Sequence, residues 1–312
     1  MIAAVLFFWV VSAILVVLES RIVPLIIYTG VFSLLSAGCF LLFAAPDVAM
    51  AQAVVGVFST IVFIVPFEKY VRLADVKRKE THTGQAMAKT PLWFSRALPL
   101  LYTAALAALF IAFIPDSSVS GYLKDQYTTM FQADVGGENA VTAIYLAYRV
   151  YDTLLEALML LVSIVALIHL SWYGESMLFP GALSNIRDSA IAGTAIRFIS
   201  PVLILFSAYL VMNGHISPGG GFQAGVVAAS FFICKYFVHD IDAISMDKVI
   251  TFEKLIYASL AFIAIAYCIL GIGAGLPVLQ TPYLMIMNLL ICIKVACGFL
   301  VLFYRFIVVE RS

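Results

Sequence analysis

The sequence predicts an all-α, polytopic integral membrane protein with about nine transmembrane helices. Hydrophobic residues make up 63% of the 312 residues and charged residues only 12%, whereas soluble domains are about 45–50% apolar. The mean hydropathy is +1.06. The hydrophobic residues fall into stretches of about 20, the length that a helix needs to cross a bilayer. The formal net charge of zero gives no argument for nucleic acid as a partner.

The first three predicted spans cover residues 1–18, 24–43 and 48–67. The N-terminus is apolar from residue 1, lacks a basic segment and shows no small-residue cleavage site. We therefore expect a retained first helix rather than a signal peptide. Pro24 suits the first turn of the second helix, where its missing N–H group is harmless.

Two polar segments predict the orientation of the chain. Residues 68–97 carry seven basic and three acidic residues, and residues 116–139 carry one basic and four acidic residues. Cytoplasmic loops of membrane proteins are rich in Lys and Arg. We therefore expect 68–97 to be cytoplasmic and 116–139 to be an outer loop, with a fourth span at 98–115 between them.

The second half of the chain contains the other five predicted spans. A mixed segment with three tyrosines, 140–152, suits a membrane interface and leads into a fifth span that ends near Trp172. Residues 174–193 are predicted to be cytoplasmic. The last four spans are expected at 194–212, 222–238, 252–272 and 283–304. This order places the N-terminus outside and the C-terminus in the cytoplasm, in the inner (cytoplasmic) membrane of the cell.

A glycine-rich stretch, residues 214–222, interrupts this hydrophobic sequence. Irregular backbone survives in a membrane protein only at the surface, against protein or beside water, so we expect an outer turn between spans six and seven. Glycine permits close approach of backbones. The residues predicted to shape a subunit contact or a cavity edge are Pro218, Gly219, Gly220 and Gly221. His215 either titrates on an ion path or holds backbone carbonyls.

Three charged residues near the start of the fifth span are candidates for an ion path. Arg149, Asp152 and Glu156 have the spacing i, i+3, i+7, which places them on one face of a helix. Acids inside a membrane cost about 2.5–3.5 kcal/mol on insertion scales and commonly mark ion routes. The alternative is an ion-paired helix entrance at the outer surface.

Lys294 and Asp47 are the other charged candidates. Lys294 lies about 15 Å from the inner end of the ninth span, too deep to reach the interface, so it is either a proton relay or the partner of a buried acid or carbonyl. Lys235 lies near the inner end of its span and is expected to snorkel. Asp47 begins the third span, where it either lies on the ion path or satisfies helix N–H groups.

The sequence gives no indication of an enzyme. It contains no H-E-x-x-H, Walker or Rossmann pattern. The five cysteines lie in apolar segments without a C-x-x-C pair and are interpreted as small buried hydrophobic residues. We expect no cofactor and no metal site.

The motifs resemble membrane subunits of Mrp-type multisubunit cation/proton antiporters and of the related membrane-bound, energy-converting hydrogenases. Residues 214–222 are similar to the Gly-His-x-x-Pro-Gly-Gly-Gly-Phe signature of MrpB. Residues 149–156 resemble an Arg-x-x-Asp-Thr-x-x-Glu run in the C-terminal part of MrpA, and residues 45–49 resemble an earlier segment of that part. Where the MrpB pattern has an acid in the last span, this chain has Asn288, and it adds Lys294. This departure favours the hydrogenase-type complexes.

The resemblance implies three parts and a role in transport. Residues 1–115 resemble a four-helix part of the MrpA tail, 116–172 form an outer loop with one helix, and 173–312 resemble a four-helix MrpB module. The implied function is that of a non-catalytic subunit in a Na⁺ or H⁺ path, with other membrane subunits as partners. Asp152, Glu156 and Lys294 are its best candidates. The alternatives are a purely structural lateral spacer and a stand-alone secondary transporter.

Overall fold

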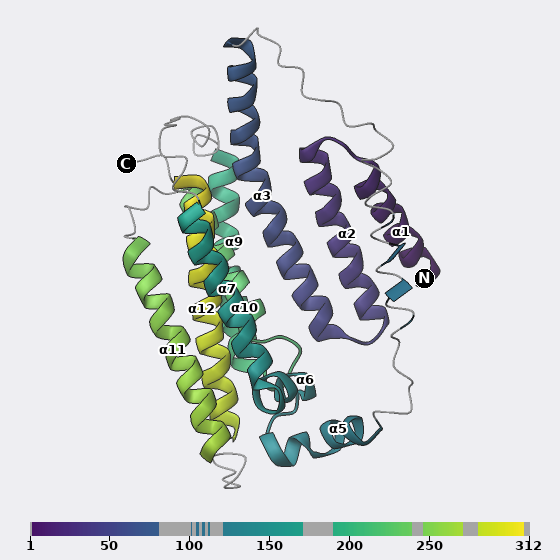
Figure 1. Ribbon diagram of the computed structural model, residues 1–312, viewed down its shortest axis with the longest axis vertical. Helices are drawn as coiled ribbons and strands as arrows, with labels where there is room; N and C mark the ends of the chain where they lie inside the picture. Colours follow the sequence, from purple (N-terminus) through teal and green to yellow (C-terminus); the bar gives the residue numbers. More distant parts are fainter. Residues whose placement is uncertain are drawn as a thin grey trace. The chain divides into compact units, whose positions relative to one another are not determined.

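The computed structural model describes residues 2–80, 101, 104–105, 108–109, 112, 121–170, 190–238, 246–270 and 280–308 (Figure 1). The regular structure of these residues is entirely helical. Contacts divide the chain into two compact units, residues 1–69 together with 130–312, and residues 70–129. The predicted all-α, multi-pass membrane fold is confirmed.

The N-terminal part of the first unit begins with three helices, α1 (Ile2–Leu18), α2 (Ile22–Leu42) and α3 (Pro46–Glu80). Small residues let α2 and α3 approach closely. A Cβ atom on Gly30 would meet the Thr60 side chain, and one on Gly56 would meet Ser33. The Ser33 hydroxyl donates a hydrogen bond to the carbonyl of Gln52, 3.1 Å away. Close packing of small residues is a common way to hold helices together in a membrane.

Helix α3 is longer than predicted. We expected the third span to end at residue 67 and a cytoplasmic loop to follow, but the helix continues to Glu80. Residues 68–80 contain neither glycine nor proline and are rich in Glu, Lys, Arg, Leu and Ala, which favour helix. The charged start of the predicted loop is therefore helical, and the rest of that loop, 81–97, lies outside the described residues.

The predicted outer loop, 116–139, also contains a helix, α5 (Gly121–Val135). The sequence between Gly121 and Gly136 has no other glycine and no proline. Gly136 has a positive φ of 75°, the left-handed conformation that commonly ends a helix. The expectation of an irregular loop is wrong for these fifteen residues.

A short irregular segment leads into the next span. Helix α6 (Ala140–Ala143) continues into a π-helical turn, η1 (Ile144–Tyr148), which ends at Arg149 before α7 (Val150–Leu170) begins. Arg149 has φ −120° and ψ 35°, so the helix is not regular there. The spacing argument that placed Arg149 on one helical face with Asp152 and Glu156 therefore does not hold at Arg149.

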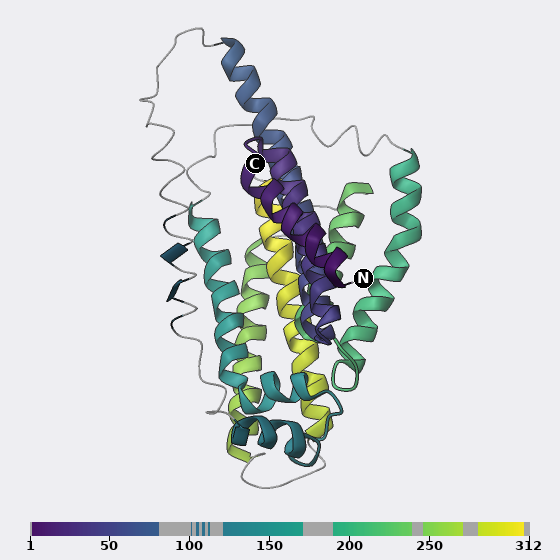
Figure 2. The same cartoon turned by 90° about the vertical axis from the view of Figure 1, so that its right-hand side faces the viewer.

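The last four helices match the predicted spans six to nine. They are α9 (Ala190–Asn213), α10 (Gly221–Val238), α11 (Met246–Leu270) and α12 (Gln280–Val308). Helix α12 contacts α7, α9, α10 and α11, and Figures 1 and 2 both show it running beside them. It is the most buried span, with 56% of its membrane window inside the protein.

Helices α10 and α12 pack through a row of small residues. Gly221, Gly225 and Ala229 recur every four residues on α10 and are buried. A Cβ atom on Gly225 would lie 2.7 Å from the carbonyl oxygen of Cys292 and 2.7 Å from the Cβ of Val295. This spacing is the small-xxx-small pattern of closely packed membrane helices.

Six described helices are long and apolar enough to cross a membrane, and α1 and α10 are shorter apolar helices. Each corresponds to a predicted span. The predicted fourth span, 98–115, lies largely outside the described residues. The total of nine therefore stays a prediction.

Candidate functional site

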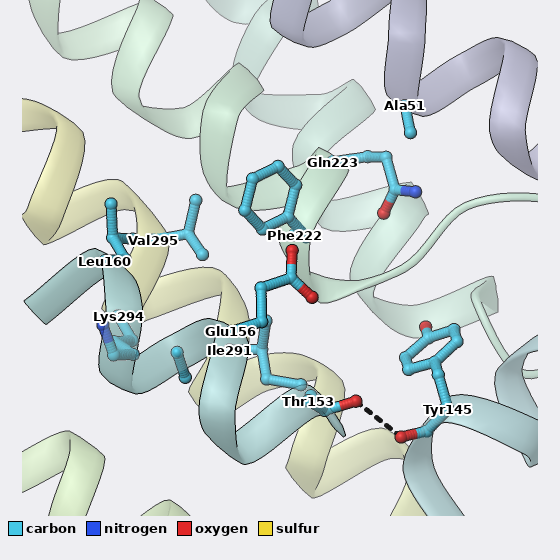
Figure 3. A pocket seen from close by; sticks show the side chains of 11 residues that line it. Ala51, Tyr145, Thr153, Glu156, Leu160, Phe222, Gln223, Ile291, Lys294 and Val295 are labelled. Carbon is cyan, nitrogen blue, oxygen red and sulfur yellow. Dashed lines mark hydrogen bonds between the residues drawn. The ribbon is translucent and has the colours of Figure 1, made fainter. Parts of the chain in front are cut away.

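A cavity of about 290 Å³ lies in the first unit, among α3, η1, α7, α10 and α12 (Figure 3). Its polar lining groups include a carboxylate, a tyrosine hydroxyl, a threonine hydroxyl and an amide. The lining residues are Ala51, Tyr145, Thr153, Glu156, Ala157, Leu160, Phe222, Gln223, Ile291, Lys294 and Val295.

Glu156 supplies the free carboxylate of this cavity. It lies on α7, near the surface of the chain, and Figure 3 shows its carboxylate pointing toward the space between Phe222 and Tyr145. No ion pair or hydrogen bond joins this carboxylate to a residue in the described ranges. The cavity thus has one carboxylate without a protein counter-ion among the residues that the structure describes.

Residue Thr153 fixes the start of α7 against the π-helical turn. Its hydroxyl donates a hydrogen bond of 2.6 Å to the carbonyl of Tyr145, and Figure 3 draws this bond at the edge of the cavity. A π-helical turn leaves backbone groups outside the regular ladder. The hydroxyl of Thr153 pairs one of them and so sets the position of Glu156, three residues further along.

Two other predicted candidates lie apart from the cavity lining. Arg149 and Asp152 form an ion pair, in which the two side chains are 62% and 54% exposed. This matches the surface ion pair that we considered as the alternative for these residues. Surface pairs contribute little to stability because solvent screens them.

Lys294 is fully buried and paired with an acid on the neighbouring helix. Its Nζ donates to Oε1 of Glu253 on α11 at 3.2 Å, and both side chains are 0% exposed. The pairing that we considered as the alternative for Lys294 is therefore present. Part of the Lys294 side chain lines the cavity.

Sequence reasoning missed Glu253. The predicted eighth span began at residue 252, which placed Glu253 at the membrane surface, but α11 begins at Met246. Seven further residues of helix shift Glu253 inward by about 10 Å. The signal that could have found it was Lys294 itself, because a buried charge requires a partner.

The glycine-rich turn connects α9 to α10 as predicted, and its last residue is held by α12. Oδ1 of the fully buried Asn288 accepts hydrogen bonds from the Gly221 N–H at 3.0 Å and from the Tyr145 hydroxyl at 3.1 Å. A Cβ atom on Gly220 would collide with the Tyr145 hydroxyl. The motif therefore shapes a cavity edge, because Tyr145 lines the cavity.

Asp47 anchors the same turn to the start of α3. Its Oδ1 accepts hydrogen bonds from the backbone N–H of Gly219 at 3.1 Å and from Nδ2 of Asn139 at 3.0 Å. Gly219 has a φ of 137°, a conformation that favours glycine. Asp47 thus bonds to groups outside its own helix.

His215 contributes to this anchoring through its backbone. Its carbonyl accepts hydrogen bonds from the N–H groups of Glu138 at 2.9 Å and Asn139 at 3.0 Å. Its buried Nδ1 has no hydrogen-bond partner among the described residues. The contacts of His215 belong to the turn, and His215 is not among the residues that line the cavity.

Comparison with known proteins relates both ends of the chain to antiporter and hydrogenase-type subunits. Residues 191–310 match the family model described as a domain related to the MnhB subunit of Na⁺/H⁺ antiporter. The C-terminal part of the chain is an MnhB-related domain. Residues 7–72 match the family model MbhD, which describes the D-type subunit of MBH. The resemblance to Mrp-type subunits is confirmed.

Two relatives extend the similarity beyond the MnhB-related domain. A protein of Staphylococcus haemolyticus named as antiporter subunit mnhA2 is 32% identical over 156 residues, which cover 49% of this chain and 18% of that protein. One of Rhizobium meliloti named as the A/B subunit of a K⁺/H⁺ antiporter is 25% identical over 244 residues, covering 69% of this chain and 23% of that protein. The chain thus spans about a fifth of the length of these relatives.

Solved structures share the fold that carries the MnhB-related domain. The Mrp complex from Dietzia sp. DQ12-45-1b matches with a TM-score of 0.74 at 18% identity, covering 97% of this chain and 34% of that chain. The membrane-bound sulfane sulfur reductase, an archaeal respiratory membrane complex, matches with a TM-score of 0.51 at 24% identity, covering 67% of this chain and 95% of that chain.

Proposed function

We propose that this protein is a non-catalytic membrane subunit of a multisubunit Na⁺/H⁺ translocating complex, in which the cavity beside Glu156 is part of the ion path. The unpaired Glu156 carboxylate on a cavity between helices carries the proposal, because intramembrane acids commonly mark ion routes. The MnhB-related domain and the similarity to antiporter subunits support it. The parent complex is a secondary antiporter or is coupled to a hydrogenase-type redox complex.

The partners in this proposal are other membrane subunits of that complex. Many large side chains on the described helices are exposed and apolar, for example Phe198 at 80% and Phe262 at 73%, so lipid or neighbouring helices cover them. The division at residues 115 and 172 and the placement of the C-terminus in the cytoplasm of the inner membrane belong to the same proposal.

Glu156→Gln tests the ion path. The amide keeps the size of the side chain and removes its charge, so we expect cation-driven proton movement to fall by about tenfold or more, which is about 1.4 kcal/mol of lost cation binding. The assay uses inverted membrane vesicles that contain the complete complex. Asp125→Asn, an exposed position on α5, is the matched control. Normal transport by an assembled Glu156→Gln complex would contradict the proposal.

The purely structural spacer is the second candidate, and the packing of the glycine turn favours it. A spacer tolerates Glu156→Gln and loses assembly with Gly220→Leu, because that side chain would displace Tyr145. An ion-path subunit loses transport with Glu156→Gln while the complex still assembles. A stand-alone transporter would instead move Na⁺ when the purified chain is placed in liposomes without other subunits.

A further inference from the structure

The ion pair between Glu253 and Lys294 lies behind one wall of the cavity. The two side chains belong to adjacent helices, α11 and α12, and are fully buried. Lys294 contributes to the cavity wall, but its ammonium group is bonded to Glu253. In Figure 3 the Lys294 nitrogen points away from the carboxylate of Glu156. The positive charge is therefore directed out of the cavity.

Helix α12 leaves space for this arrangement. A Cβ atom on Gly298 would lie 3.4 Å from Oε1 of Glu253 and 2.8 Å from Cδ1 of Ile164 on α7. The Lys294 nitrogen also lies 6.0 Å from the centre of the Tyr257 ring, at the outer limit of a cation–π contact. The pair thus occupies a fitted position where α7, α11 and α12 meet.

The pair has a consequence for the charge of the cavity. Lys294 and Glu253 together are neutral, which leaves the single negative charge of Glu156 on the cavity. Without the Glu253 carboxylate, the buried ammonium would need another acceptor. The flexible four-carbon side chain of lysine can reorient, and the carboxylate that lines the same cavity belongs to Glu156.

We propose that Glu253 is a specificity-determining residue, which holds the Lys294 ammonium out of the cavity so that Glu156 stays free for a transported monovalent cation. This inference rests on the proposed ion path through the cavity. It assigns Lys294 the role of a tethered charge whose position Glu253 controls, rather than that of a proton relay. Oε2 of Glu253 has no hydrogen-bond partner among the described residues, so the bond to Lys294 is the contact that orients this carboxylate.

The test compares Glu253→Gln, Glu253→Gln/Lys294→Met and Lys294→Met in vesicles with the complete complex. The readout is the Na⁺ concentration that gives half-maximal transport, with K⁺ measured in parallel. In Glu253→Gln the freed ammonium competes for Glu156, so this concentration should rise by about tenfold or more. The double variant removes the competing charge and should recover most of the loss. A role in packing alone would not predict recovery when a second buried group is changed.

Lys294→Met keeps the inference testable if Glu253→Gln does not assemble. We expect this variant to retain transport that Glu156→Gln loses. Loss of transport by an assembled Lys294→Met complex, or by the assembled double variant, would overturn the inference and indicate a relay. Normal half-maximal Na⁺ in Glu253→Gln would also overturn it. Normal transport by Glu156→Gln is a separate result, which rejects the proposed ion path itself.

Discussion

Asn288 shows how one side chain in the middle of α12 connects the glycine-rich turn to the cavity. Its Oδ1 accepts from the N–H of Gly221 and from the hydroxyl of Tyr145. An unpaired donor buried in the bundle costs more than a hydrogen bond contributes. Asn288 therefore holds the start of α10 and the π-helical turn in fixed positions beside Glu156.

Replacing Asn288 should destabilise this corner of the protein. Asn288→Leu keeps a similar volume but leaves two buried donors without an acceptor, which should lower the free energy of unfolding by ~2–6 kcal/mol. The measurement is the thermal unfolding of the purified complex in detergent. Asn288→Asp keeps an accepting oxygen at the same position and should lose less. Equal losses in the two variants would show that the hydrogen bonds do not matter.

The residue types at the site were predictable from sequence, but their partners were not. Lys294 was recognised as too deep to reach water, yet Glu253 appeared to lie at a helix end. Asp47 was expected on an ion path or at its own helix terminus, whereas it binds Gly219 and Asn139. Contacts between residues far apart in the chain depend on helix packing, and the periodicity of one helix does not determine that packing.

At the scale of elements, the packing of α10 on α12 depends on glycine. Gly221 and Gly225 lie four residues apart and face the backbone and side chains of α12. Sequence analysis identified the glycine-rich stretch but attributed shape only to its turn. The row of small residues continues into the helix, where it brings Gln223 and Phe222 to the wall of the cavity.

Gly225→Ala tests this seam with the smallest possible addition. A methyl group there meets a backbone carbonyl and the Cβ of Val295, neither of which can move as a flexible side chain can. We expect a loss of about 1–3 kcal/mol in stability from overpacking, measured as a lower unfolding midpoint. Gly193→Ala is the control, because a Cβ atom at Gly193 in α9 meets no atom within 4 Å. Gly193→Ala should be neutral or slightly stabilising, since alanine favours helix.

At the scale of the whole molecule, hydrophobic length predicted the helices well and their ends poorly. Eight predicted spans correspond to described helices, because about 20 apolar residues are a strong signal in a membrane protein. Helices α3 and α11 extend beyond their apolar parts, since helix formation does not stop where hydrophobicity stops. Helix α5 was missed because it is polar.

The number of spans determines which side of the membrane each loop faces. If residues 98–115 cross the membrane, the end of α3 and helix α5 lie on opposite sides, and if they do not, both lie on the same side. Single cysteines at positions 77 and 125, placed in a variant without the five native cysteines, distinguish these topologies. We expect an impermeant maleimide to label position 125 from outside intact cells and position 77 only in inverted vesicles, because the basic segment favours the cytoplasm. Labelling of both positions from one side would remove the fourth span, and with it the predicted total of nine.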